Sequence, residues 1–156
     1  MKSRNTAASV RDRLIRHARE TNQDPNRALV RFAGERLLHR LSISPYADRF
    51  VLKGALLFEL WFDTPHRPTR DIDLLSYGES DAPALVALFR TLCAIEADDG
   101  VIFQNESINA EEIRATAEYA GVRITLLAVI GGARCPLQID VGFGDVVTPD
   151  PETAGF

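Results

Sequence analysis

The chain has 156 residues, a formal net charge of -4 and 46% hydrophobic residues. This length suits one compact domain, and the ordinary apolar fraction with a modest net charge excludes a disordered chain. The charge is divided unevenly, because residues 1–49 carry eleven basic and five acidic residues, whereas residues 50–156 carry seven basic and seventeen acidic residues. A basic front of this kind is typical either of a polyanion-binding surface or of solvated helix faces.

The sequence lacks the patterns of export, membrane insertion and zinc binding. The first residues contain no apolar signal segment, and the longest apolar stretch, residues 124–133, is too short to span a bilayer. Cys93 and Cys135 form no metal-binding pair, so we expect two small buried residues of a reduced protein. These features predict a soluble cytoplasmic protein.

Residues 1–45 predict two amphipathic helices. Ser9 and Asp12 have the spacing of a capping box, and apolar residues recur at helical spacing after them. Asp24 and Pro25 predict the start of the second helix, with the aspartate as N-cap and the proline in the first turn.

The second predicted helix has an apolar stripe and a basic remainder. The apolar positions are Leu29, Ala33, Leu37 and Leu41. The basic positions, which we expect on the solvent-facing side, are Arg27, Arg31, Arg36 and Arg40.

Strand and helix patterns alternate after the break at Ser44-Pro45. Residues 50–52 predict a short strand, residues 55–62 a buried helix and residues 64–68 a loop. Residues 71–77 predict a strand, and a helix is expected to begin at residues 81–83.

The rest of the sequence is rich in β patterns. Residues 101–103 predict a short strand, and residues 110–116 are ambiguous. Residues 121–130 and 137–143 predict two strands joined at Gly131-Gly132 as an antiparallel hairpin. The predicted fold class is therefore α+β, with a helical lead-in (1–45) followed by a core (46–156) in which helices pack on a mixed β-sheet.

Asp71 and Asp73 are the first candidates for chemistry. Residues i and i+2 of a strand point to the same face, about 7 Å apart, while Ile72 and Leu74 point to the other. Two carboxylates this close repel each other unless a cation lies between them, and oxygen ligands of this kind suit Mg²⁺ or Mn²⁺. The alternative is a strand end whose acidic side chains are simply solvated.

Asp140 is the one acidic residue within the apolar strand pattern of residues 137–143. If this strand lies beside that of Asp71 and Asp73, the three carboxylates form a metal clamp for phosphoryl chemistry. The alternative is a single paired aspartate at the end of a sheet.

Residues that could bind a triphosphate flank these acids in the sequence. Lys53 and Gly54 end a predicted strand where a helix begins, and a glycine followed by a helix N-terminus lets backbone N–H groups approach phosphate. Thr69 and Arg70 directly precede Asp71. An ordinary strand-to-helix turn and solvated loop charges are the alternative, because the spacing of a P-loop is absent.

Three segments in order, FVLKGALLFEL, RPTRDIDLL and PLQIDVGFGD, resemble the AbiEii/AbiGii nucleotidyltransferase toxin family, a branch of the DNA-polymerase-β-like nucleotidyltransferases. The resemblance covers about residues 10–151. It implies that Gly54 and Ala55 occupy the family's glycine turn, that Asp71 and Asp73 are its paired acids, and that Asp140 is its third acid. Ala55 departs from the Ser or Gly of that turn.

The resemblance implies a metal-dependent transferase, using Mg²⁺ or Mn²⁺, that moves a nucleotide from an NTP to RNA, in some family members to tRNA. It also implies a role as the toxin of a type IV toxin–antitoxin or phage abortive-infection system, with an AbiEi-like antitoxin as partner. Family members continue into a helical C-terminal half, so we expect this sequence to represent the N-terminal half. The alternatives are a truncated, non-catalytic module that binds nucleotide, RNA or antitoxin, and a metal-dependent nuclease.

Overall fold

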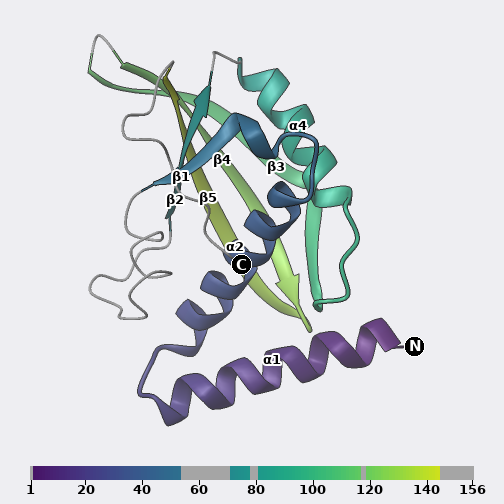
Figure 1. Cartoon of the computed structure of the whole chain (residues 1–156). Helices are drawn as coiled ribbons and strands as arrows, with labels where there is room; N and C mark the ends of the chain where they lie inside the picture. The colour runs from purple at the N-terminus through teal and green to yellow at the C-terminus, as the bar shows by residue number, and fades with distance from the viewer. Residues whose placement is uncertain (1, 54–70, 78–80, 117–118, 145–156) are drawn as a thin grey trace.

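A computed structural model describes residues 2–53, 71–77, 81–116 and 119–144 (Figure 1). Its helices are α1 (Lys2–Glu20), α2 (Pro25–Ser42), the short 3₁₀ helix η1 (Ala47–Arg49) and α4 (Ala82–Ala94). Its strands are β1 (Phe50–Lys53), β2 (Asp71–Tyr77), β3 (Val101–Thr116), β4 (Tyr119–Ile130) and β5 (Ala133–Gly144). The α+β prediction is confirmed.

The five strands form one mixed sheet in the order β1-β2-β5-β4-β3. Strand β2 pairs in parallel with β5, and the other three pairings are antiparallel. The predicted hairpin is confirmed as β4 and β5, joined by Gly131 and Gly132, whose φ angles of 54° and 86° are those of a tight hairpin turn. Strand β5 begins at Ala133, four residues before the predicted start.

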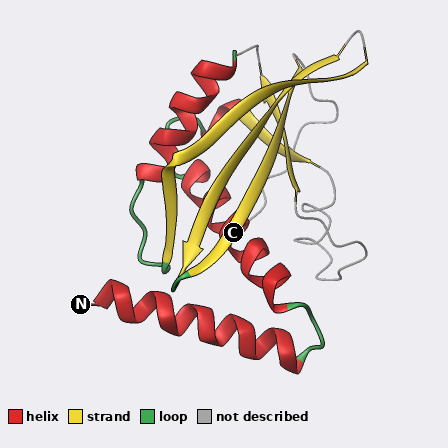
Figure 2. Ribbon diagram, turned by 180° about the vertical axis from the view of Figure 1, so that it is seen from behind, coloured by secondary structure: helices red, strands yellow, loops and turns green. Residues whose placement is uncertain are grey.

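Helices α2 and α4 cover one face of the sheet (Figures 1 and 2). The apolar stripe predicted for α2 is buried together with the inward-facing residues of the strands. Gly34 brings α2 close to β2, because an added Cβ there would lie 3.2 Å from Cδ1 of Ile72. Helix α2 therefore shares one core with the sheet. The predicted boundary between residues 45 and 46 stays a prediction.

The capping box predicted at Ser9 is wrong. Helix α1 begins at Lys2, so Ser9 lies inside it and its carbonyl accepts a hydrogen bond from Arg13. Residues 2–8, which precede Ser9, are also helical because α1 docks on the end of the sheet. Arg11 donates to the carbonyl of Gly131, and the backbone of Ala7 lies against both Gly100 and Gly131.

The N-cap predicted for α2 is confirmed. Asp24 has extended backbone angles, and its side chain accepts a hydrogen bond from the N–H of Asn26 at 3.1 Å. Pro25 occupies the first turn, where its missing N–H costs nothing. The same device starts α4, where Asp81 caps the helix and Pro83 lies in the first turn.

Residues 101–116 form one long strand rather than a short strand and an ambiguous segment. The strand contains a bulge, because residues 105–108 lie opposite Leu126 alone. The hydroxyl of Ser107 spans this bulge: it donates to the carbonyl of Gln104 at 2.6 Å and accepts from the N–H of Leu127 at 2.8 Å. Periodicity does not reveal the strand, since the bulge shifts the alternation halfway along it.

The expectation that all four arginines of α2 face solvent is wrong for Arg40. Arg40 is only 2% exposed. Its Nη1 and Nη2 donate to Oδ2 and Oδ1 of Asp99 at 3.0 Å and 3.2 Å, and the two side chains form an ion pair. Arg36 reaches the same carboxylate at 2.7 Å. The ring of Phe103 lies 4.7 Å from the guanidinium carbon of Arg40. This cluster ties α2 to the segment between α4 and β3.

Asp99 is expected to contribute stability through this pair. Burial acts to raise the pKa of its carboxyl, but hydrogen bonds from Arg40, Arg36 and the N–H of Val101 outweigh burial and hold the pKa below 3.8. A carboxyl whose pKa is depressed on folding contributes stability above its unfolded pKa and loses it as the pH falls through the folded value.

Asp99→Asn should lower the free energy of unfolding at pH 7 by about 3 kcal/mol, because it leaves Arg40 buried without a negative partner. The difference between variant and wild type should shrink as the pH falls below about 4 in urea titrations. Asp98→Asn, an exposed neighbour, is the control and should change stability little. Equal effects of the two substitutions would contradict the role given to Asp99.

Gly131→Ala and Gly132→Ala test how α1 docks on the sheet. Both glycines have positive φ, so each substitution should cost about 1 kcal/mol in backbone strain. At Gly131 the new Cβ would also lie 2.9 Å from the carbonyl oxygen of Ala7, whereas at Gly132 it would meet nothing within 4 Å. Thermal unfolding should therefore show the larger loss for Gly131→Ala, and the reverse order would contradict this docking.

Candidate active site

The candidate acids meet in one row across the sheet. In the parallel pairing of β2 with β5, Asp73 lies directly opposite Asp140. Their chain neighbours Ile72, Ile139 and Val141 are buried in the core. Because strand residues alternate between faces, both aspartates point to the face opposite α2. The condition set by the sequence, that the two strands be adjacent, is met.

The same row continues in both directions. Lys53 is the register partner of Asp73 on β1, and Arg123 is the register partner of Asp140 on β4. Glu111 of β3 lies opposite Arg123 at the far end of the row. Opposite charges therefore occupy neighbouring positions at both sides of the pair of aspartates.

Arg123 forms a two-pronged ion pair with Asp140. Its Nε donates to Oδ1 at 3.0 Å and its Nη2 donates to Oδ2 at 3.3 Å. The side chains are 35% and 23% exposed, so the pair is partly screened from water. Sequence reasoning missed Arg123, although the alternation of residues 121–130 already assigned it to the face opposite Val122 and Ile124.

A second row, of polar residues, borders the charged one. Asp71 pairs with Gln138 on β5, and Gln138 pairs in turn with Thr125 on β4. Thr125 is opposite Asn109 of β3. Since these positions are two residues from the charged row along each strand, they lie on the same face. This face therefore offers hydrogen-bonding groups beside the aspartates.

The remaining predicted residues are only partly within the described chain. The backbones of Lys53 and Asp71 are described as strand residues, but their side chains are not. Gly54, Ala55, Thr69 and Arg70 lie outside the described residues, as does the helix predicted for residues 55–62. The described part of β1 ends at Lys53, which is the register partner of Asp73, and β2 begins at Asp71.

The donor set of the row fits a hard divalent cation. Asp73 and Asp140 supply carboxylate oxygens from two neighbouring strands, and neighbouring strands of a sheet are spaced about 4.8 Å apart. Carboxylate oxygens are the ligands preferred by Mg²⁺ and Mn²⁺. Within the described side chains, no cluster of three His, Cys, Asp or Glu residues is assembled for a metal. A third carboxylate beside this pair of aspartates would have to come from Asp71, which lies two residues before Asp73 on β2.

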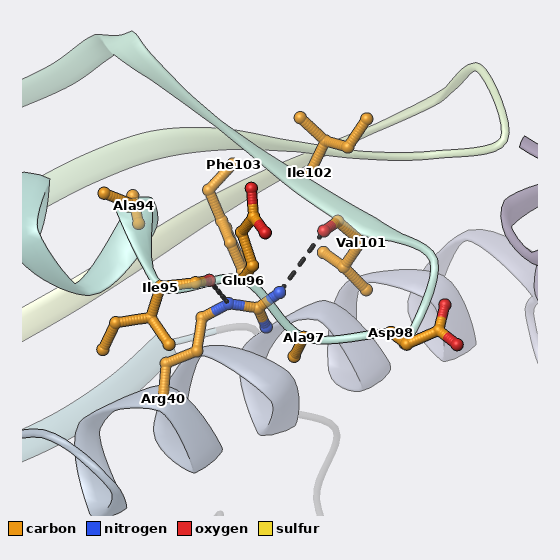
Figure 3. A pocket seen from close by; sticks show the side chains of 10 residues that line it. Arg40, Ala94, Ile95, Glu96, Ala97, Asp98, Val101, Ile102 and Phe103 are labelled. Atoms are coloured by element: carbon orange, nitrogen blue, oxygen red, sulfur yellow. Dashed lines mark hydrogen bonds between the residues drawn. The ribbon is translucent and has the colours of Figure 1, made fainter. Parts of the chain in front are cut away.

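A separate pocket of about 600 Å³ lies between the end of α4 and the start of β3 (Figure 3). Arg40 lines it, but Nε of Arg40 donates to the carbonyl of Ile95 at 3.0 Å and Nη2 donates to that of Val101 at 3.4 Å. Cys93 also lines it, and burial raises the pKa of this thiol to about 11 despite the nearby charge of Arg40. The pocket thus holds a structural cation and a protonated thiol, and we assign no chemistry to it.

The prediction of two buried cysteines is confirmed for Cys135, whereas Cys93 is only partly buried. Cys93 and Cys135 are both free, and Cys135 is only 1% exposed. Burial raises the pKa of Cys135 as well. In the described parts of the chain, no helix is both long and apolar enough to cross a membrane.

In the described part of the chain, the mixed sheet of this α+β fold carries paired aspartates on the face opposite α2 and α4 (Figure 1). A family model, described as "Nucleotidyl transferase AbiEii toxin, Type IV TA system", matches residues 36–156. The chain therefore belongs to the AbiEii nucleotidyltransferase toxin family. The match begins within α2, and α1 precedes it.

No curated protein and no solved structure was found to match the chain. The resemblance predicted from the sequence is confirmed by the family match. Membership implies a nucleotide substrate and, since the family consists of toxins of toxin–antitoxin systems, an antitoxin partner.

Proposed function

We propose that the chain is a divalent-metal-dependent nucleotidyltransferase that moves a nucleotide from an NTP to an RNA acceptor. The observation that carries the proposal is the register of β2 and β5, which sets Asp73 directly opposite Asp140 on one face of the sheet. Membership of the AbiEii family supports the reaction class. The proposal concerns a cytoplasmic toxin, in an abortive-infection setting, with an AbiEi-like antitoxin as its partner.

Asp71, Asp73 and Asp140 are the proposed ligands of Mg²⁺ or Mn²⁺. When bound, such cations offset the negative charge of a triphosphate and help to ionise the attacking hydroxyl. Asp71 and Asp73 are two residues apart on β2, and Asp140 approaches from the neighbouring strand. Two strands of a rigid sheet thus hold the proposed catalytic carboxylates in register.

The proposed triphosphate contacts come from residues 53–55, at and after the end of β1, and from residues 69 and 70, which precede β2. Lys53 occupies the register position next to Asp73, and Gly54 with Ala55 follows directly. Thr69 and Arg70 lead directly into β2. We assign these five residues to phosphate binding through charge, hydroxyl and backbone N–H groups.

The neighbouring polar row is suited to the sugar or base of a bound nucleotide. Gln138 and Thr125 are partly exposed and lie on the same face as Asp140, one row away. Amide and hydroxyl groups both donate and accept hydrogen bonds, as ribose and base edges require. These two side chains are the proposed orienting contacts.

The basic surface proposed for RNA is narrower than the sequence suggested. Arg36 and Arg40 are committed to Asp99, and Arg31 pairs with Glu35. Arg27 at the start of α2 is exposed, as are several arginines of α1, Arg16 and Arg19 among them. Helix α1 lies at the end of the sheet where the β4–β5 turn is (Figure 1). We therefore place the electrostatic contact with RNA on α1.

The catalytic proposal predicts loss of transfer on neutralising either described aspartate. Asp73→Asn and Asp140→Asn should each reduce the incorporation of labelled NTP into RNA by at least about a hundredfold, because several kcal/mol of transition-state stabilisation depend on the clamp. The assay combines the chain, Mg²⁺, each labelled NTP in turn and total RNA. Glu106→Gln, an exposed change in the β3 bulge, is the control and should leave incorporation intact.

The same assay separates the alternatives. Equal incorporation by wild type and Asp73→Asn would contradict the catalytic proposal. NTP binding without turnover would favour a non-catalytic module, and restored turnover on adding a separate C-terminal half would return the assignment to the enzyme. RNA that becomes shorter rather than longer would favour a nuclease.

The RNA surface predicts a salt-dependent effect on α1. The double variant Arg16→Gln/Arg19→Gln should weaken RNA binding and reduce the slope of log K against log salt by about 0.7 for each single-strand phosphate that is no longer neutralised. The control is Arg90→Gln/Arg134→Gln, which removes the same charge from exposed positions on α4 and β5. Equal slopes for the two double variants, measured by fluorescence anisotropy, would remove RNA binding from α1.

A further inference from the structure

We infer that Arg123 is a positioning residue that holds the carboxylate of Asp140 when no divalent cation is bound, and that the cation has to displace it. The inference rests on the metal site proposed above. It assigns a role to a residue outside the set of acids and phosphate-binding groups. Its basis is the two-pronged contact between neighbouring strands, with N–O distances of 3.0 Å and 3.3 Å.

The position of Asp140 explains why this contact matters. Its strand lies between β2 and β4, so Asp73 is its neighbour on one side and Arg123 on the other. Two carboxylates in adjacent register positions repel each other. The guanidinium of Arg123 compensates one of these charges and thereby reduces the repulsion between the two aspartates.

The geometry also sets up a competition. Both oxygens of Asp140 accept hydrogen bonds from Arg123, and the partial burial of the two side chains limits screening by water. A cation placed between Asp73 and Asp140 would therefore meet a carboxylate already paired with a positive charge. Because a bound cation draws electron density from this carboxylate, its binding weakens the two hydrogen bonds from Arg123.

The displaced guanidinium has a second carboxylate within the row. Glu111 is the register partner of Arg123 on the opposite side from Asp140, and it is exposed. Arg123 thus lies between two acids, one at the proposed metal site and one near the edge of the described sheet. Rotation of the Arg123 side chain toward Glu111 would move its charge away from Asp140 while keeping it on the same face of the sheet.

The test is the affinity of the chain for Mn²⁺, measured by electron paramagnetic resonance of the free ion without nucleotide. Arg123→Gln should bind Mn²⁺ about tenfold more tightly than wild type, because the competing charge is removed. Arg123→Lys should tighten binding about threefold, because lysine keeps the charge but loses the paired geometry. Arg134→Gln, which removes an arginine from the same face of β5, is the control and should leave the affinity unchanged.

A double-variant comparison connects the effect to Asp140. In an Asp140→Asn background, Arg123→Gln should change Mn²⁺ affinity little, because the carboxylate for which arginine and cation compete has gone. Circular dichroism verifies that each variant is folded. Should Arg123→Gln fail to fold, Arg123→Lys supplies the comparison.

The outcomes distinguish this inference from the proposed function. Mn²⁺ binding that is absent, or that is unaffected by Asp73→Asn and Asp140→Asn, would remove the metal site itself. Alternatively, Mn²⁺ binding could depend on both aspartates but be unchanged or weaker in the folded Arg123 variants. That result would show that the cation does not displace Arg123, while the metal site itself would still stand.

Discussion

The parallel pairing of β2 with β5 is the constraint on which the candidate site depends. The two strands are far apart in the sequence, and their register alone sets Asp73 opposite Asp140. A shift by one residue would turn the side chain of one aspartate into the core, because neighbouring strand positions alternate between faces. The apolar neighbours Ile72, Ile139 and Val141 prevent that shift, since each is buried beneath the helices. The core thus determines the geometry of the charged row.

Charge is used differently in different parts of this fold. On the helix-covered side, Arg40 and Asp99 form a buried pair that joins α2 to the segment before β3, and its role is structural. On the opposite face, Asp140 and Arg123 form a partly exposed pair next to another carboxylate. Breaking the first pair leaves an uncompensated buried charge, whereas the charges of the second pair are partly open to water. Burial therefore separates a structural ion pair from one suited to function.

Membership of the AbiEii family and the register of the sheet both support the proposed transferase. The family match concerns residues 36–156 and depends only on sequence, whereas the row of aspartates depends on strand pairing. Helix α1 lies outside the match, yet it docks on the sheet through close contact of Ala7 with Gly100 and Gly131. Helix α1 adds an exposed basic surface to the part of the chain that the family model matches.

The sequence by itself determined the local elements and supplied the candidate acids. The capping patterns at Asp24 and Asp81, the strand at residues 71–77 and the glycine turn of the hairpin were all predictable, because each depends on residues close together in the chain. The family was recognisable for a related reason, since its motifs are short and ordered.

Only the tertiary structure decided which residues meet across the sheet. The start of α1 depends on its docking, the continuity of β3 on a bulge closed by Ser107, and the burial of Arg40 on a partner far along the chain. The sequence did not predict the contact between Arg123 and Asp140, because this contact arises from strand register and not from a motif. Periodicity reports which face a residue takes, but long-range pairing decides what it touches there.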